Sequence, residues 1–363
     1  MNVVITGYGV VTPYGLGVET MMQGIDSNTI PFIDKEINIH KYVKLPSGIV
    51  PPINENLYNE ISYNISRIIT NASIYAYLAY KEAKQMAMLS DIDASKAAIF
   101  IGSTLPSINN NKLATDIFKS FINNPAFILA EIIGSTNRVI APCSACSTGL
   151  QAINLATEAI KSGQIDIAIC GATEEWSEEL ANIFIKLGIV SKTGCRPFAN
   201  DRDGIIISEG AGILILESEE HAKNRLASYN RVIAGTGYSF STNPSAPTKE
   251  SIMKCMLDSY SYFHQTKNEG EKNEVAICAH ATGTYMGDKT ELEAINDFKK
   301  LIYKNSKTRL DIIYYKQLLG HTMAASGVIE LIASLREYIP VLNNAFGLGG
   351  VNCSTLVVPY QYL

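Results

Sequence analysis

The sequence predicts an α/β protein with a largely parallel or mixed sheet, on two observations. Short runs rich in Val and Ile alternate along the chain with longer segments of helical periodicity. The run Val3–Gly9 also has a counterpart in Arg231–Gly237, since an apolar triplet lies just ahead of Gly-x-Gly in both. We interpret the two runs as the openings of two equivalent halves of a duplicated fold.

Each predicted element rests on its own periodicity. Apolar residues at every third or fourth position indicate helices, whereas short continuous apolar runs indicate buried strands. The segment after Cys146 has small and aliphatic residues at helical spacing and ends near Gly163. In chain order the predictions are a strand at 3–5, helices at 18–22 and 69–88, strands at 97–101 and 138–141, a helix from about 147 to 163, and a buried strand at 165–171 that stops at Gly171.

Composition excludes several classes of protein. Of 363 residues, 47% are hydrophobic and 18% are charged, which is enough apolar material for about two domains with a sizeable core. The net charge is 30 − 35 = −5, which argues against a nucleic-acid partner. No apolar run reaches the ~18 residues of a membrane span, so we expect no membrane association. The N-terminus has no positive region ahead of its apolar run, so we expect a strand there, no signal peptide, and a cytoplasmic protein.

Seven cysteines in a long chain without a secretion signal argue against a disulfide framework. The close pair Cys143 and Cys146 resembles half of a zinc site or a redox pair. A zinc site would need a second such pair or two histidines at ligand spacing, and none of the five histidines lies within five residues of another. A redox pair is typical of a short thioredoxin-like chain. We therefore predict no metal.

Cys146 lies where a strand-like segment meets the start of a helix. The helix dipole and the free N–H groups at this end favour a thiolate and also stabilise an oxyanion, so the position suits a nucleophile. A buried structural cysteine is the alternative interpretation.

Two histidines lie at comparable positions. His280 follows an apolar strand and opens a loop rich in hydroxyls and glycine, and His321 precedes a helix of small residues, whose dipole favours the neutral imidazole. Either histidine alone is equally explained as a hydrogen-bonded structural residue. Together with Cys146 they indicate a Cys–His–His site for acyl transfer.

Six motifs occur in a fixed order from residue 3 to residue 352. They are Val3–Pro13, Ala145–Gly149, Arg196–Gly212, the loop after His280, Lys316 to Glu330 with Gly320-His321 between them, and Phe346–Asn352. In this order they resemble the motifs of the elongating β-ketoacyl-[acyl carrier protein] synthases, members of the thiolase-like superfamily. The block Arg196–Gly212 carries no group suited to the chemistry, and we interpret it as shaping the fold.

The resemblance implies a thiolase fold, a duplicated α-β-α-β-α five-layer sandwich. The first half would be residues 1–225 and carry the nucleophile, and the second would be residues 226–363 and carry both histidines. The active site would lie where the halves meet. The family implies an acyl carrier protein as partner, with the substrates on its phosphopantetheine arm and no separate cofactor. It also implies either a homodimer or a heterodimer with a homologue that resembles a chain-length factor.

The resemblance also implies a role for each site residue. Cys146 would accept the acyl group, with the backbone N–H groups of Cys146 and Leu348 as the oxyanion hole. His280 and His321 would stabilise the enolate formed when malonyl-carrier loses carbon dioxide. The remaining implied site residues are Lys316 and Glu330 supporting the histidines, Thr282 and Thr284 contacting the arm, Phe346, Gly347 and Leu348 contacting the substrate, and Asp288 and Glu291 bracing the histidine loop.

The chain departs from the family pattern in several places. It is contracted between about Asn28 and Ser135 and again between Glu330 and Phe346, which affects the cap of the acyl tunnel and the dimer contact. Ala281 replaces a usual glycine and Tyr285 a common proline. Leu348 replaces an aromatic residue often found at the gate between the two substrate sites, which should alter gating or acyl preference and indicates specialised secondary metabolism. The resemblance as a whole implies a role in fatty acid, polyketide or polyene biosynthesis.

Two alternatives remain open from the sequence. A thiolase acting on coenzyme A, or a starter-unit enzyme, would use a second cysteine or an asparagine where this chain has His321. A non-catalytic subunit resembling a chain-length factor commonly lacks the nucleophile, whereas this chain retains Cys146, His280, His321 and Lys316. The sequence therefore favours a catalytic subunit that pairs with itself or with a degenerate homologue.

Overall fold

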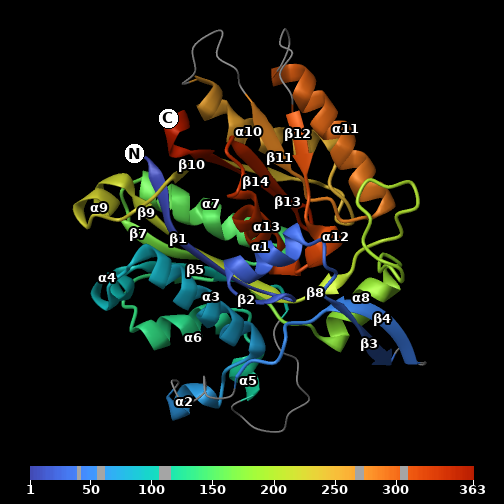
Figure 1. Cartoon of the computed structure of the whole chain (residues 1–363), viewed down its shortest axis with the longest axis horizontal. Helices are drawn as coiled ribbons and strands as arrows, with labels where there is room; N and C mark the ends of the chain where they lie inside the picture. The colour runs from blue at the N-terminus through green and yellow to red at the C-terminus, as the bar shows by residue number, and fades with distance from the viewer. Residues whose placement is uncertain (39–41, 55–61, 106–115, 266–273, 303–309) are drawn as a thin grey trace.

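The computed structural model describes residues 1–38, 42–54, 62–105, 116–265, 274–302 and 310–363 (Figure 1). Its central feature is a mixed sheet in the order β12-β11-β13-β14-β10-β1-β9-β7-β5-β6. The first half of the sheet contains β1 (Val3–Thr12), β9 (Gly210–Ser218), β7 (Ile167–Glu174), β5 (Ala98–Gly102) and β6 (Val139–Ile140). The second half contains β10 (Arg231–Phe240), β14 (Val351–Pro359), β13 (Val341–Phe346), β11 (Val275–Cys278) and β12 (Leu310–Ile313).

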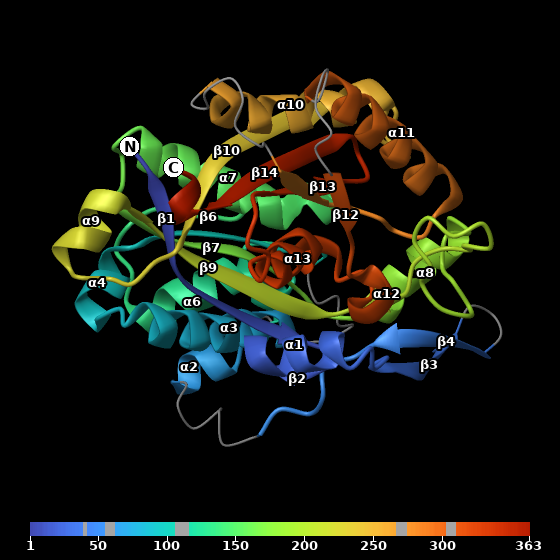
Figure 2. The same cartoon turned by 45° about the horizontal axis from the view of Figure 1, so that its top comes forward.

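The two halves repeat the same strand pattern outward from the centre. Beginning at β1 or at β10, each half continues with two antiparallel pairings and then two parallel pairings. The central strands β1 and β10 pair antiparallel at Val4 and Val232, and they lie side by side in Figure 2. The predicted duplication is therefore confirmed.

Helices form three layers around the two half-sheets, which completes the predicted five-layer sandwich (Figure 1). The outer helices of the first half are α3 (Asn71–Ala87) and α6 (Asn124–Ile133), and those of the second half are α10 (Lys249–Gln265) and α11 (Tyr285–Ile302). Between the half-sheets lie α7 (Thr148–Lys161) and α13 (Ser326–Ser334). These two helices are buried on nearly all sides, which explains their small and aliphatic composition.

Helix packing explains why the same Gly-x-Gly pair occurs in both halves. A Cβ atom added at Gly7 or Gly9 would collide with main-chain oxygens of α3, and one added at Gly235 or Gly237 would collide with main-chain oxygens of α10. Only glycine lets a helix cross its strand this closely. The Gly-x-Gly pairs therefore mark the same helix crossing in each half.

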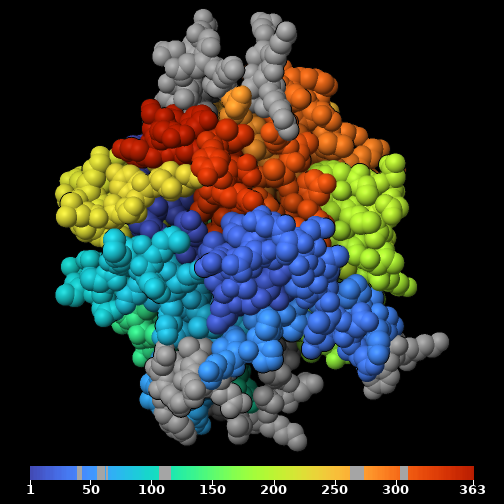
Figure 3. Space-filling view, viewed as in Figure 1, coloured from blue at the N-terminus to red at the C-terminus, as the bar shows by residue number. Residues whose placement is uncertain are grey.

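The remaining elements are shorter. They are β2 (Gly15–Leu16), α1 (Val18–Asp26), a small sheet of β3 (Phe32–Asn38), β4 (Tyr42–Gly48) and β8 (Ile207–Ser208), α2 (Tyr63–Ser66), α4 (Asp91–Lys96), α5 (Asp116–Lys119), η2 (Ala145–Ser147), α8 (Glu178–Lys186), α9 (Glu219–Asn224), α12 (Lys316–Leu319), η3 (Met323–Ala325) and η4 (Tyr360–Tyr362). Helix α1 lies on the surface against the second half, where Asp26 pairs with Arg336 at 2.7 Å (Figure 3). Among the described helices, none has both the length and the apolar character needed to cross a bilayer.

Several boundaries differ from the predictions. The strand predicted at 3–5 continues as β1 to Thr12, and the helix predicted at 18–22 continues as α1 to Asp26. The strand predicted to stop at Gly171 continues as β7 to Glu174, because Gly171 lies where β7 and β9 approach too closely for a side chain rather than at a turn. The helix predicted near residue 147 begins with the 3₁₀ turn η2, which holds Cys146, and the α-helix starts at Thr148. The predicted division at residue 225 falls between α9 and β10 and stays a prediction.

Candidate active site

Helices α7 and α13 cross at their N-terminal ends, and this crossing builds the site. A Cβ atom at Gly149 would lie 2.9 Å from the Ala324 carbonyl oxygen, and one at Gly327 would lie 2.8 Å from Leu150 Cγ. The two glycines therefore allow the turns η2 and η3 to touch. Each turn begins with a residue of positive φ, Ala145 at 51° and Met323 at 45°. The turns place the nucleophile from the first half against residues of the second.

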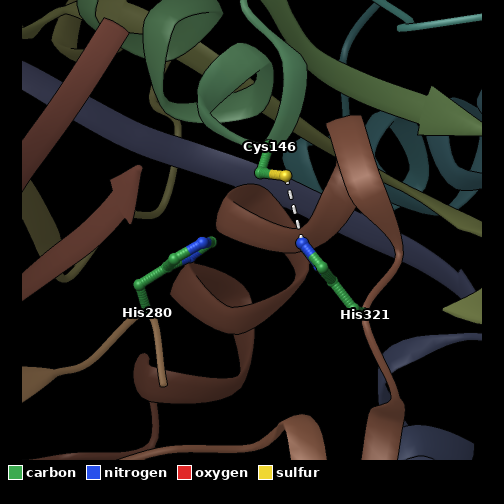
Figure 4. A group of neighbouring side chains, drawn as sticks. All are labelled: Cys146, His280 and His321. Carbon is green, nitrogen blue, oxygen red and sulfur yellow. Dashed lines mark hydrogen bonds between the residues drawn. The ribbon is translucent and has the colours of Figure 1, made fainter. Parts of the chain in front are cut away.

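Cys146, His280 and His321 come together at this crossing (Figure 4). The Cys146 Sγ atom lies 3.1 Å from His321 Nε2. The His280 and His321 rings are 5.5 Å apart and nearly perpendicular, and Figure 4 shows a nitrogen of His280 turned toward Cys146. His280 also packs edge to face on Phe346 at 5.4 Å. All three titratable residues are buried.

Electrostatics set the resting protonation of this group. Burial raises the pKa of the Cys146 thiol to about 11, while the Lys316 ammonium and the Leu348 backbone N–H act in the opposite direction. Burial, and then the nearby Lys316 charge, lowers the pKa of His280 and of His321 well below the usual value. At neutral pH the site therefore holds a thiol beside two neutral imidazoles.

The His321 ring has a partner on each nitrogen. Its Nδ1 atom lies 3.3 Å from Ser326 Oγ, on the far side of the ring from Cys146. With Nδ1–H donating to Ser326, Nε2 is free to accept the thiol proton of Cys146. This is the arrangement of a nucleophile with an oriented base.

Two backbone N–H groups near the Cys146 sulfur are the ones predicted to form an oxyanion hole, and that role stays a prediction. The backbone N–H groups of Leu348 and Cys146 both act to lower the pKa of the Cys146 thiol, against the larger effect of burial. Gly347 lets the chain pass against Ser144, where a side chain would collide with the Ser144 carbonyl oxygen. Ser147 Oγ donates to the Val351 carbonyl at 2.9 Å and so ties the nucleophile turn to this glycine-rich loop.

Lys316 and Glu330 form a fully enclosed ion pair beneath the histidines. Lys316 Nζ donates to both carboxylate oxygens of Glu330 at 2.7 Å. Burial raises the pKa of Glu330 to about 7, and the Lys316 ammonium offsets part of that rise. Because the Lys316 charge also lowers both histidine pKa values, the pair acts as a fixed charge that favours neutral imidazoles.

Two buried carboxylates hold the loop that follows His280. Glu291 accepts from the backbone N–H groups of His280 at 2.7 Å and Ala281 at 2.8 Å. Asp288 accepts from the backbone N–H of Gly283 at 3.0 Å. Ala281 has φ of 43°, a conformation that favours glycine, so the Glu291 contact keeps an alanine where the family commonly has glycine.

A cavity of about 330 Å³ connects the surface with Cys146. The predicted site residues that line it are Cys146, His280, Thr282, Thr284, Glu291, His321, Phe346, Gly347 and Leu348. The Thr282 and Thr284 hydroxyl oxygens lie 2.9 Å apart. Lys316, Glu330 and Asp288 lie behind this surface and not on it.

Several lining residues were not predicted. Phe184 and Ile189, on and just after α8, and Arg202 form one side of the cavity. The apolar face of α8 offered a signal for Phe184, but nothing in the sequence connected that face with Cys146. For Arg202 the only signal was its place in a motif that we interpreted as structural.

Glu174 was also missed. This carboxylate ends the buried strand β7 and accepts from Ser103 Oγ at 3.1 Å, from Thr104 N at 3.0 Å and from Ala324 N at 3.3 Å. Burial raises its pKa to about 7. It therefore ties the end of β5 to the turn η3 beside Cys146. Its signal in the sequence was a charged residue directly after an apolar strand.

The side chains of Cys146, His280 and His321 also carry atoms that can bind a metal ion. In the described part of the chain, Cys146, His280 and His321 place their ligand atoms within 4.8 Å of one another. Sulfur and imidazole nitrogen are ligands that suit zinc. The absence of a metal stays a prediction.

The fold and the cysteine–histidine site define an acyltransferase of the thiolase fold. The sequence matches the Beta-ketoacyl synthase, N-terminal domain over residues 1–222 and the Beta-ketoacyl synthase, C-terminal domain over residues 232–337. The chain therefore belongs to the β-ketoacyl synthase family.

Individual relatives align with nearly the whole length of this chain. A 3-oxoacyl-[acyl-carrier-protein] synthase 1 of Buchnera aphidicola is 27% identical, with 98% of each chain covered. The mitochondrial 3-oxoacyl-[acyl-carrier-protein] synthase of Arabidopsis thaliana is 25% identical and covers 98% of this chain and 92% of its own. The fold is shared with a β-ketoacyl synthase of Burkholderia phymatum, at a TM-score of 0.87, 22% identity and 99% of both chains.

Proposed function

We propose that this chain is a catalytic β-ketoacyl-[acyl carrier protein] synthase, which joins malonyl-carrier to an acyl group held on Cys146 in a decarboxylative Claisen condensation. The observation that carries the proposal is the 3.1 Å contact between Cys146 Sγ and His321 Nε2, with His280 beside it. A chain-length-factor-like subunit without chemistry would have no need of this geometry.

The first step is acyl transfer. The Cys146 thiol gives its proton to His321 Nε2 as sulfur attacks the thioester carbonyl of the incoming acyl-carrier. The backbone N–H groups of Cys146 and Leu348 hold the oxyanion. The carbon–sulfur bond to pantetheine then breaks, and the departing thiolate takes the proton from His321.

The second step forms the carbon–carbon bond. Once Cys146 is acylated, His321 takes the tautomer in which Nδ1 accepts from Ser326 Oγ and Nε2–H is the donor. The thioester oxygen of malonyl-carrier then accepts hydrogen bonds from the neutral imidazoles of both His280 and His321. When the bond to the carboxylate breaks, carbon dioxide leaves and its electron pair forms an enolate on that oxygen. The enolate carbon attacks the acyl carbonyl on Cys146, and the Cys146 thiolate leaves. The thiolate takes a proton from His321 Nε2, 3.1 Å away, and the imidazole regains a proton from water. Donors aimed at developing charge in a buried site are effective because they need no rearrangement.

The acyl carrier protein is the proposed partner for both steps. Thr282 and Thr284 line the cavity, which supports the proposal that they contact the phosphopantetheine arm. A solved neighbour with 22% identity is a type II polyketide synthase acyl-carrier protein in complex with its ketosynthase. The reaction needs no separate cofactor, and the cytoplasmic location expected from the sequence is part of the same proposal.

Leu348 is proposed to set the acyl preference. It lines the cavity and packs against an apolar cluster that includes Phe184, Ile205 and Met323. A leucine leaves room and flexibility that an aromatic ring at the same place would remove. The substrate is therefore an acyl chain of fatty acid or polyketide type whose length this cluster limits.

We also propose that the chain pairs with a second ketosynthase chain through β6. This strand is last in the sheet order, and its side chains Val139 and Ile140 are 41% and 37% exposed. An exposed apolar edge strand is a template for another chain. The segment that precedes this strand in the chain also has exposed apolar side chains, namely Ile117, Phe118, Phe121, Ile122 and Phe127. A structural neighbour of 22% identity is the ishigamide ketosynthase/chain length factor.

Intact-protein mass spectrometry tests the catalytic proposal. The wild-type chain and the Cys146→Ala variant are each incubated with an acyl carrier protein that is loaded with an acyl group. We expect a thioester adduct on the wild type only, and loss of that adduct when malonyl-carrier is added. An unmodified wild type, even with a ketosynthase-like partner supplied, would contradict a catalytic role and favour a non-catalytic subunit.

A further inference from the structure

The loop between His280 and Tyr285 is held at nearly every peptide by side chains from outside the loop. Glu291 holds the N–H groups of His280 and Ala281, and Asp288 holds that of Gly283. Two further contacts come from Arg202 in the block Arg196–Gly212, which the sequence led us to interpret as structural, and one comes from Cys195 just ahead of that block. Together these contacts hold the backbone that carries Thr282 and Thr284, the two threonines proposed to bind the pantetheine arm.

Arg202 makes the central contacts. Its Nε donates to the Thr284 carbonyl at 3.2 Å, and one terminal nitrogen donates to the Tyr285 carbonyl at 2.9 Å. Its other terminal nitrogen donates to the Ala199 carbonyl at 2.7 Å. The guanidinium lies 4.9 Å from the centre of the Tyr285 ring. A planar group with a rigid fork of donors suits this task, because it fixes two successive peptides at once.

Cys195, which directly precedes the block, and the Phe198 backbone within it complete the attachment. Cys195 Sγ lies 3.5 Å from the Thr282 carbonyl oxygen. Asp288 bridges to the block through the backbone N–H of Phe198 at 2.7 Å, and it lies 3.7 Å from Arg202 Nε. The Asp288 and Arg202 side chains are only 1% and 10% exposed, so water competes little for these bonds.

Fixing this backbone also fixes the threonine hydroxyls. Threonine is branched at Cβ, so its side-chain rotamers depend closely on the backbone. The Thr282 and Thr284 oxygens lie 2.9 Å apart and face the cavity together. A loop freed from Arg202 would lose this pair as a preorganised contact for the arm.

We infer that Arg202 is a positioning residue for the pantetheine arm, acting through Thr282 and Thr284. The inference rests on the proposed ketosynthase function. It assigns a substrate-binding task to a motif that carries no reacting group. It also explains why Arg202 borders the cavity although its donors point to backbone oxygens rather than into the open space.

The test compares acylation of Cys146 by two thioesters of one acyl group, one of pantetheine and one of ethanethiol, followed by intact mass. Arg202→Ala should lower kcat/KM for the pantetheine thioester roughly ten- to hundredfold, mainly through KM, since bonds from a charged donor are lost. The ethanethiol thioester lacks the arm, so its rate should be unchanged. Arg202→Lys should restore part of the loss, because it keeps the charge without the fork.

Arg196 provides the matched control. It lies in the same block, but among the described residues its side chain bonds to Thr193, Gly194, Asp201 and Asp203, none of which belongs to the His280 loop. Arg196→Ala should therefore leave the ratio of the two rates as in the wild type. A double substitution of Thr282 and Thr284 by alanine should reproduce the selective loss, and adding Arg202→Ala to it should change little.

The outcomes separate this inference from the proposed function. Equal losses on both thioesters in Arg202→Ala would show a general structural role and overturn the inference, as would no loss on either. In both cases an acylated wild type would leave the ketosynthase proposal intact. A wild type that accepts neither thioester would overturn both.

Discussion

At the residue scale, the enclosed pair of Lys316 and Glu330 shows how a charge can serve the site without touching substrate. Both side chains are nearly inaccessible, at 0% and 4% exposure. Burying two charges is costly unless they satisfy one another, and here both carboxylate oxygens receive the ammonium. The pair is therefore retained at an energetic cost that hydrophobic side chains would avoid.

Lys316→Ala should lower the free energy of unfolding by about 3–5 kcal/mol, because it leaves the Glu330 carboxyl buried without a partner. The double variant Lys316→Met with Glu330→Leu should recover most of that stability. Condensation should stay impaired in both, since the charge that helps to keep His280 and His321 neutral is gone. Urea unfolding followed at one pH, with separate acylation and condensation assays, checks both parts.

Full recovery of condensation in the double variant would contradict this role. It would mean that burial alone keeps the two imidazoles neutral, with the ion pair serving only the fold.

At the element scale, the crossing of α7 and α13 decides whether the site exists. Each helix offers a glycine at the contact, Gly149 and Gly327, and the nucleophile lies three residues before the first of them. A shift of either helix by a fraction of an ångström changes the distance between Cys146 and His321.

Gly149→Ala should slow acylation of Cys146 at least tenfold, because misplacement of a reacting group by about 1 Å is costly. Overpacking at the contact should also destabilise the fold by about 1–3 kcal/mol. Gly163→Ala is the control, since Gly163 follows the other end of the same helix and an added Cβ meets no atom within 4 Å. Its φ of 71° makes it a test of backbone strain alone.

The measurement is the rate of adduct formation by mass spectrometry, alongside thermal unfolding. If both glycine variants acylate at the wild-type rate, the close crossing is not needed to position Cys146.

At the scale of the whole molecule, the exposed strand β6 is the feature that a second chain would cover. Ile140→Lys places a charge on this edge and should disrupt the pairing, because lysine on an edge strand opposes further strand addition. Light scattering should give twice the 39.6 kDa chain mass for the wild type and a single chain mass for the variant.

Leu226→Lys is the control for the same assay. Leu226 is 88% exposed and follows α9, which packs on β1 and β9, whereas β6 is at the end of the sheet order, so this variant should pair as the wild type does. A wild-type chain that is monomeric alone and pairs only with a homologue would contradict self-pairing and support the heterodimer.

Much of the fold was predictable because it depends on local patterns. Buried strands and helices leave their periodicity in the sequence, and the Gly-x-Gly echo marked both halves. The interpretation of Gly171 as a stop was wrong for a non-local reason: glycine there serves the approach of another strand, Gly210–Ser218, which lies far along the chain.

The candidate site was likewise only partly predictable from the sequence. Cys146, His280 and His321 each lie at the end of an element, so their chemistry was visible one residue at a time. The partners of Arg202 and Glu174 were not visible, because the bond from Arg202 to Thr284 spans 82 residues and that from Ala324 to Glu174 spans 150.

By itself, the sequence determined the fold class, the duplication and the three groups suited to acyl transfer, since these follow from periodicity, residue type and position at helix ends. Only the tertiary structure decided that the three groups meet at the crossing of α7 and α13, that Lys316 and Glu330 neutralise each other, and that Arg202 holds the threonine loop. The physical reason is that protonation and close approach depend on burial and on neighbours distant in sequence, which no local pattern records.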